Sequence, residues 1–257
     1  MKRNKAKINR RSFVSGVIGT AAAGTLTGCG QTEPPTYGNI LRMGDWLTYK
    51  AHRLIVPEHA LAREYETSDI SAHPAIGTTN PADPERGGRH PEYAPEYAGY
   101  LKDSFAGYGL RIEGLVERPG LYSLASLKRL PSRTQITRHA CEEGWSAIAE
   151  WIGVPLRAVL EAAGIKPNAR YVQLYAFDGW ADGIDMVDAT HPQTLLAYGM
   201  NGRDLPVPHG APLRLRVERQ VGYKNMKFLR GITVTESFDD HGQDGNIQNG
   251  WSWYVGV

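Results

Sequence analysis

The sequence predicts an α+β fold built from mixed sheets with short helices and long loops. Three observations support this. Short strand-like segments recur between residues 110 and 234, one segment has apolar residues at helical spacing, and Gly- and Pro-rich stretches separate them. The chain has 257 residues, of which 41% are hydrophobic. This is enough to bury the core of one catalytic domain.

Residues 1–29 have the order of features expected of an export signal. Basic residues come first and include the pair Arg10-Arg11, followed by the short, weakly apolar run Val14–Leu26. Paired arginines at this place resemble the twin-arginine signal that exports folded proteins. The run ends in Leu26-Thr27-Gly28-Cys29, which resembles a lipobox, so Cys29 is expected either to carry a lipid or to lie near the cleavage site by chance.

The charge of the chain changes once this segment is set aside. The net charge is +2, but six of the 29 Lys and Arg residues lie within residues 1–29, where there is no acidic residue. The remainder has 23 basic against 27 acidic residues, a net charge of −4. A weakly acidic domain lacks the basic face that displaces counterions from phosphates, which disfavours a nucleic-acid partner.

The region from residue 30 to about residue 107 is rich in Pro, Gly and charged residues. We expect a tether and N-terminal loops at 30–60, followed by a catalytic domain at 61–257 that begins with long ordered loops. One helix is predicted within this region, at Glu58–Tyr65, because the segment contains carboxylates together with Ala and Leu residues.

Regular elements become recognisable from residue 110 onwards. Leu110–Val116 alternates as a strand does, and Arg118–Gly120 is predicted to turn after it. Apolar residues at helical spacing predict a short helix from Leu156 to Ala163, which Gly164 would end. Further strands are predicted at 171–175, 213–217 and 232–234.

Only two cysteines are present, Cys29 and Cys141. Because the first lies in the export segment, no disulfide framework is possible in the domain. A single thiol in an oxidising compartment is either buried and inert or takes part in chemistry, and composition alone leaves both readings of Cys141 open.

Three sequence blocks resemble the sulfite-oxidase family of molybdopterin proteins, and most of all its periplasmic methionine-sulfoxide-reductase branch. The first block contains Arg138-His139-Ala140-Cys141-Glu142-Glu143-Gly144-Trp145-Ser146 and continues to Leu156. The second runs from His191 to Arg214, and the third is Val221–Leu229. Together they cover roughly residues 110 to 235, in the order the family has.

The resemblance implies a molybdenum–molybdopterin cofactor with Cys141 as the protein ligand to the metal. A soft thiolate suits such a metal, and the dithiolene sulfurs of the cofactor would supply the other soft ligands. The pterin ends in a phosphate, which charged side chains and backbone N–H groups would hold.

The resemblance also assigns roles to individual residues. Arg138, Glu143 and Trp145 join Cys141 as candidate catalytic residues around the metal. The candidate cofactor-binding residues are His139, His209, Arg214, Lys224, Asn225, Met226, Lys227, His73, Thr78 and Asn80. The alternative is that these residues have no role in the site. His139 would then be a structural hydrogen-bonding residue, and Arg214 and Arg216 would be solvent-facing strand residues. Lys224 and Lys227 would be ordinary surface charges.

The activity implied is oxygen-atom transfer on a small or protein-bound sulfur compound, by an exported periplasmic enzyme. The reaction is either sulfoxide reduction or sulfite oxidation; the few residues after Val234 and the lack of a recognisable Arg-rich pocket favour reduction. A separate electron-transfer partner, such as a membrane haem subunit, is expected, and the chain is expected to be a monomer. The alternative is a non-enzymatic exported lipoprotein that binds another anion in the same basic pocket. No Gly-rich dinucleotide loop, Walker motif or zinc-spaced cluster is present.

Overall fold

The computed structural model describes residues 43–72, 80–84, 94–237 and 252–257. The predicted export signal with Arg10, Arg11 and Cys29 lies outside the described residues, as do His73 and Thr78. No helix in the described part of the chain is long and apolar enough to cross a membrane.

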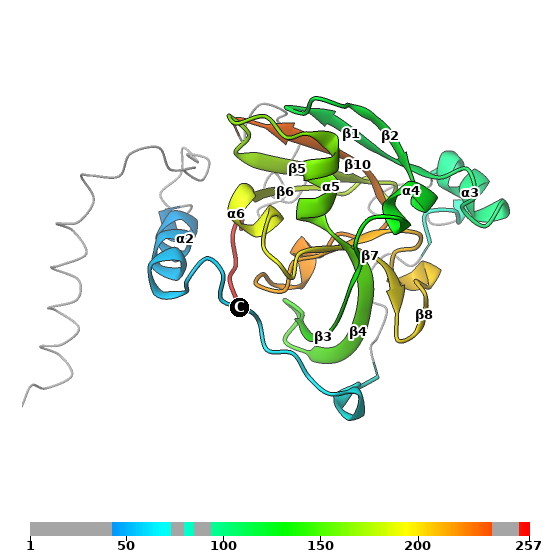
Figure 1. The fold of residues 1–257 in the computed structure, drawn as a ribbon. Coiled ribbons are helices and arrows are strands. Elements are labelled where there is room, and N and C mark those ends of the chain that lie inside the picture. The colour runs from blue at the N-terminus through cyan, green and yellow to red at the C-terminus, as the bar shows by residue number, and fades with distance from the viewer. Residues whose placement is uncertain (1–42, 73–79, 85–93, 238–251) are drawn as a thin grey trace, which may run out of the picture. The chain divides into compact units, whose positions relative to one another are not determined.

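Two five-stranded sheets make up most of the fold (Figure 1). The first has the order β2-β1-β10-β5-β6, in which β1 and β10 run parallel and all other neighbours are antiparallel. The second has the order β3-β4-β7-β8, and β9 also pairs with β7. The strands are β1 (Gly109–Gly114), β2 (Gly120–Ser123), β3 (Arg133–Ala140), β4 (Ser146–Pro155), β5 (Tyr171–Ala176), β6 (Ala181–Asp185), β7 (Leu195–Met200), β8 (Arg203–Asp204), β9 (Arg214–Arg216) and β10 (Leu229–Thr235).

Short helices precede or connect these strands. They are α2 (Met43–Ile55), α3 (Pro95–Lys102), α4 (Leu124–Lys128), α5 (Leu156–Ala163) and α6 (Met186–Ala189), with 3-10 turns η2 (Thr67–Asp69), η4 (Val207–His209) and η5 (Gly222–Lys224). The predicted α+β class, with mixed sheets and short helices, is therefore confirmed.

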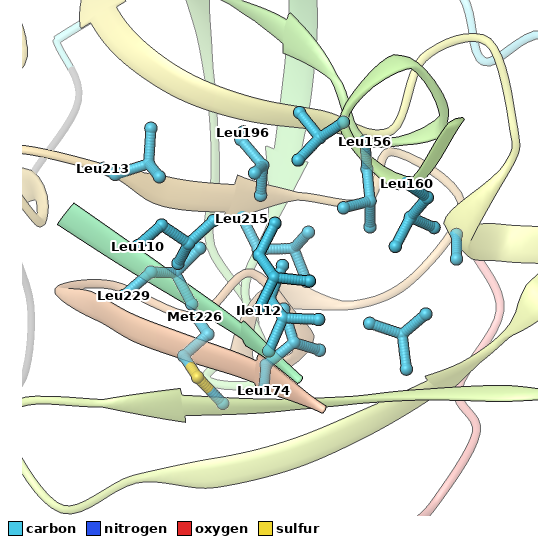
Figure 2. Close-up of a cluster of buried hydrophobic side chains, with 14 of the residues drawn as sticks. Leu110, Ile112, Leu156, Leu160, Leu174, Leu196, Leu213, Leu215, Met226 and Leu229 are labelled. Atoms are coloured by element: carbon cyan, nitrogen blue, oxygen red, sulfur yellow. The ribbon is translucent and has the colours of Figure 1, made fainter. Parts of the chain in front are cut away.

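The main core is formed by side chains from both sheets together with α5. Figure 2 shows Leu110 and Ile112 of β1, Leu174 of β5, Leu196 of β7 and Leu215 of β9 in one cluster. Helix α5 contributes its buried face to this core, and Gly164 ends the helix with a φ of +74°, which favours glycine. The helix and the strands predicted at 110–116, 171–175, 213–217 and 232–234 are thus present, with ends that differ by a few residues.

The N-terminal region differs from the prediction. The segment 58–65 is not a helix, because its polar groups bond to other parts of the domain instead. The side chain of Gln193 binds both the N–H and the C=O of Ala62, and Glu64 forms a β-bridge with Thr137 of β3. Helices are found at α2 and α3 instead, so residues 43–55 are not a bare tether.

Candidate active site

A tight hairpin between β3 and β4 presents Cys141. The two strands pair up to Ala140 and Ser146, and the N–H of Cys141 donates to the C=O of Trp145 at 2.9 Å. Gly144 closes the turn with a φ of +89°. Side chains alternate along a strand, so Gln135 and His139 face the protein interior, and Cys141 follows in the same phase. Its thiol is partly buried.

Two carboxylates lie beside the thiol. Oε2 of Glu142 is 3.4 Å and Oε2 of Glu143 is 4.0 Å from Sγ of Cys141. Glu143 also accepts a 3.0 Å hydrogen bond from the indole of Trp145. Burial, followed by the charges of these two glutamates, raises the pKa of Cys141 to about 11. Without a bound cation this thiol stays protonated at neutral pH, whereas metal coordination would convert it to a thiolate.

His139 is held from behind by a buried ion pair. Arg216 lies 2.7 Å from Nδ1 of His139 through Nη1, and its other nitrogens bind Glu218 at 3.2 and 2.7 Å. Gln135 donates to the same glutamate, which completes a buried network. Because a guanidinium can only donate, Nδ1 accepts, and a neutral His139 carries its proton on Nε2.

The loop after β9 packs directly against the Cys141 hairpin. A Cβ placed on Gly222 would lie 3.0 Å from Nε2 of His139, 3.1 Å from Cα of Cys141 and 2.9 Å from Oε2 of Glu142. A larger residue would displace the Glu142 carboxylate and crowd His139 and the Cys141 backbone, so glycine favours this close approach. The third sequence block is thereby brought against the first.

The far end of the same loop meets a cluster of cationic groups. Arg214 is almost fully buried and donates to the C=O of His209 at 2.9 Å and to the C=O of Asn225 at 2.8 Å. Burial first, and Arg216 next, lowers the pKa of Arg214 to about 9. Burial also lowers the pKa of Lys227 to about 8 and that of His209 to about 4, with Arg214 as the next cause for both.

This cluster has the chemistry of an anion site. Burial and the neighbouring positive charges disfavour the charged form of all three groups, and a bound anion would favour it. Nε of Arg214 is buried without a hydrogen-bond partner among the described residues. A terminal phosphate would satisfy this donor and restore the charge balance, so the cluster fits the phosphate end of a pterin cofactor. One loop therefore links the Cys141 thiol to a cationic cluster that fits an anion.

The remaining residues of the third block have structural contacts. The ammonium of Lys224 binds Asp182 and, at 2.8 Å, the C=O of Gly183. Residues of β6 therefore hold this ammonium, and it does not belong to the cationic cluster. The side chain of Asn225 holds its own loop by accepting from the N–H of Val217 at 2.8 Å. Met226 places its side chain in the apolar core (Figure 2).

Two other candidates remain, Arg138 and Asn80. Arg138 is exposed on the face of β3 opposite to His139. Its side chain therefore leaves the strand on the other side from His139 and Cys141. Asn80 stabilises a local turn by accepting from the N–H of Ala82 at 3.0 Å.

The sequence did not predict the buried network of Arg216, Glu218 and Gln135 that contacts His139. Arg216 is fully buried with its guanidinium 4.4 Å from the ring centre of Trp151, and Arg214 lies 5.0 Å from the same ring. The solvent-facing reading of these two arginines is therefore wrong, because β9 runs through the interior and pairs with β7. The only available signal was the Arg-Leu-Arg-Val-Glu pattern, in which Arg216 and Glu218 share one face of an extended strand.

No group of three or more His, Cys, Asp or Glu side chains is placed to hold a metal ion in the ranges that the structure describes. A metal carried by an organic cofactor needs fewer protein ligands than a metal bound by protein alone. The single thiolate of Cys141 agrees with such an arrangement.

Comparison with known proteins places these features in a family. Residues 99–242 match the family model of the oxidoreductase molybdopterin binding domain. A putative protein-methionine-sulfoxide reductase subunit, YedZ1, of Azospira oryzae is 38% identical over 59% of this chain and 56% of its own length. The protein-methionine-sulfoxide reductase catalytic subunit MsrP of Xanthomonas campestris pv. campestris is 34% identical over 52% of this chain and 46% of its own length.

Among solved structures, the sulfane dehydrogenase SoxCD from Paracoccus pantotrophus matches with a TM-score of 0.48 and 24% identity, over 54% of this chain and 41% of that one. The chain spans about half the length of the curated relatives it matches. The family match covers all three sequence blocks that carried the resemblance.

Proposed function

We propose, because this chain belongs to the family of oxidoreductase molybdopterin-binding domains, that it holds a molybdenum–pterin cofactor through Cys141 and transfers an oxygen atom to or from a sulfur compound. The observation that carries this proposal is the loop 222–227. Gly222 touches the Cys141 hairpin at one end of the loop, and the carbonyl of Asn225 binds Arg214 at the other. A thiol and an anion site are thus held at a fixed separation, as a cofactor with a metal at one end and a phosphate at the other requires.

Different residues would bind the metal, bind the phosphate and orient the His139 ring. Cys141 would ligate the metal, which in such a cofactor supplies two-electron oxygen-atom transfer. His209, Arg214 and Lys227 would bind the phosphate. Arg216 and Glu218 would fix the His139 ring, which points its Nε2 toward Gly222 beside the metal ligand.

The charges around Cys141 favour a neutral substrate. Glu142 and Glu143 are exposed and lie next to the thiol, while Arg216, which contacts His139, is buried and paired with Glu218. An anion such as sulfite would approach two carboxylates, whereas a sulfoxide carries no net charge. We therefore propose sulfoxide reduction, in which the sulfur compound loses its oxygen, two electrons and two protons are consumed, and water forms.

Substrate preference tests this proposal. The double variant Glu142→Gln/Glu143→Gln should lower the KM for sulfite about five-fold relative to that for methionine sulfoxide, since removing exposed like charges is worth about 1 kcal/mol. The control is Glu113→Gln, which removes an exposed carboxylate from β1. Steady-state kinetics of the metal-loaded protein with both substrates measures the ratio. A wild-type protein that prefers sulfite, or an unchanged ratio in the double variant, would contradict the assignment.

We also propose that the protein works in the periplasm with a separate electron-transfer partner. The chain contains only Cys29 and Cys141, too few for an iron–sulfur cluster, and it has no c-type haem motif, so electrons must be exchanged with another molecule. A membrane haem subunit is the partner that the family resemblance suggests. The mature domain, from residue 61 to 257 with the preceding segment attached, would act as a monomer and bind no nucleic acid.

The export route is testable through the leader. Changing Arg10 and Arg11 together to Lys should keep the protein out of the periplasm, since the twin-arginine pathway reads the pair. Cell fractionation measures this, and normal periplasmic levels in the variant would exclude the route. In the same fractions, labelled palmitate should be incorporated by the wild-type protein and not by Cys29→Ser if Cys29 is lipidated.

The alternative of a non-enzymatic binding lipoprotein is disfavoured by the family assignment. Such a protein would contain no molybdenum when purified after export. Metal analysis of the wild-type protein distinguishes the two.

A further inference from the structure

Helix α2 faces the domain with aromatic and polar side chains and leaves its aliphatic side chains outside. Tyr49 packs against the rings of Trp253 and Tyr254 and donates to Asp185 at 3.0 Å. Arg53 forms ion pairs with Asp185 at 2.9 Å and with Asp188 at 3.1 Å. Arg53 also lies between the rings of Tyr49 and Tyr254, at 5.2 and 5.1 Å from their centres. These contacts fix which side of the helix faces the domain (Figure 1).

The outward side of α2 carries no charge. At 100° per residue, six exposed positions fall within a sector of about 120°. They are Gly44, Leu47, Thr48, Ala51, Leu54 and Ile55. Leu54 is 86% and Ile55 76% exposed, although a surface helix normally turns such side chains inward. Of the six large hydrophobic residues exposed in the described part of the chain, three lie on this face and a fourth, Leu61, follows it closely.

We propose that this outward face of α2, defined by Leu47, Ala51, Leu54 and Ile55, lies on the surface of a phospholipid bilayer. The helix has 13 residues, fewer than the roughly 20 that a membrane-spanning helix needs, so it would lie parallel to the membrane plane. Trp46 and Lys50 stand at one border of the face, with the ammonium 5.9 Å from the ring centre. Aromatic and Lys side chains of this kind are typical of the boundary between acyl chains and water.

The position of α2 in the chain supports the same occupant. Residues 30–42 connect it to Cys29, and even a fully extended segment of this length spans only about 45 Å. A lipid on Cys29 would therefore hold α2 near the bilayer, where a modest apolar face is enough for contact because a second, weak attachment acts at high effective concentration.

The size of the face argues against a protein partner as its occupant. Stable protein interfaces use about 20–30 residues on each side, and the exposed face of α2 offers six positions. A bilayer has no such minimum, because it adapts to a single helix face. This inference does not depend on the proposed enzymatic activity.

Site-specific photocrosslinking tests the proposal. Benzoylphenylalanine replaces Leu54 in the full chain, which is then illuminated with vesicles of phosphatidylethanolamine and phosphatidylglycerol that carry a radiolabelled acyl chain. The matched control places the same group at Leu121 on β2, which is 63% exposed. Both variants keep the same leader, so the vesicle is attached in the same way in both, and the comparison reports which surface of the domain meets the acyl chains.

We expect about ten-fold more lipid adduct at position 54 than at position 121, since only α2 would lie in the interface. Equal labelling at the two positions, or no lipid adduct at 54, would overturn the proposal. An adduct between two copies of the chain, or within one chain, in place of the lipid adduct would overturn it as well and identify the true occupant. Cofactor content is measured in parallel, so loss of the enzyme function is recognised separately.

Discussion

Cys141→Ser is expected to abolish turnover while the protein still folds and still contains pterin. The proposed attachments of the cofactor are divided, because the cationic cluster of Arg214, Lys227 and His209 lies at the other end of the 222–227 loop from the thiol. Loss of one metal bond leaves the phosphate contacts in place. Replacing a soft anionic sulfur by a neutral, harder hydroxyl changes the electron density at the metal, and the redox steps depend on it directly.

Three quantities measured together test this expectation. Turnover should fall by about a thousand-fold or more, as is usual when a residue at a reacting centre is lost, while pterin content per protein stays near that of wild type. The thermal unfolding midpoint should hardly change, since Ser fits the space of Cys. Wild-type turnover at wild-type metal content would instead identify Cys141 as a buried, inert thiol.

Arg214→Ala should have the second largest effect. In contrast to Cys141→Ser, it should lower the cofactor content of the protein more than the turnover per bound cofactor. The guanidinium is the only group in the cluster that reaches both the His209 and the Asn225 carbonyls while leaving a buried Nε for a ligand. Charge-assisted hydrogen bonds of this kind contribute about 1.5–3 kcal/mol each, so cofactor affinity should fall roughly ten- to hundred-fold. Turnover per bound cofactor should change much less than the occupancy does.

The matched control for this variant is Arg203→Ala, which removes an exposed arginine from β8. Pterin and molybdenum are determined in both purified variants, with turnover expressed per molybdenum. Full occupancy in Arg214→Ala would show that the phosphate of the cofactor is held elsewhere. Loss of cofactor could also result from a failure to fold. Circular dichroism of the apo protein distinguishes such a variant from one that folds and binds the cofactor weakly.

Several parts of the fold could be predicted because their signals are local. Helix α5 has apolar residues at helical spacing and a glycine stop, and β1 and β10 carry apolar side chains that fill the core. The hairpin that carries Cys141 was recognised as a motif but not as two strands. The inward face of β3 consists of Gln135, Thr137 and His139, so its period of two is polar and has no hydrophobic signal.

Other parts depend on contacts that the sequence does not reveal. The segment 58–65 has helix-forming residues, yet Gln193 and β3 bind it in an extended form. The burial of Arg214 and Arg216 follows from the position of β9 beside β7 and over Trp151. Helix α3 had a usable signal in Pro95 at its first turn, which favours helix starts, but its Pro- and Gly-rich surroundings concealed it.

The difference between prediction and structure at α2 is the most informative one. The composition of residues 30–60 predicts a tether and N-terminal loops, whereas residues 43–55 form a helix that Arg53 and Tyr49 bind to the domain. A helix that uses its charges for docking leaves its apolar residues outside, and this arrangement can be recognised only when the buried partners Asp185 and Asp188 are known.

X-ray absorption spectroscopy at the molybdenum edge would detect Cys141 directly as a ligand of the molybdenum–pterin cofactor. The purified wild-type protein is compared with Cys141→Ser at equal molybdenum content. We expect one sulfur neighbour fewer around the metal in the variant, with the two dithiolene sulfurs of the pterin retained. Identical sulfur coordination in the two proteins, or no molybdenum in the exported wild-type protein, would contradict it.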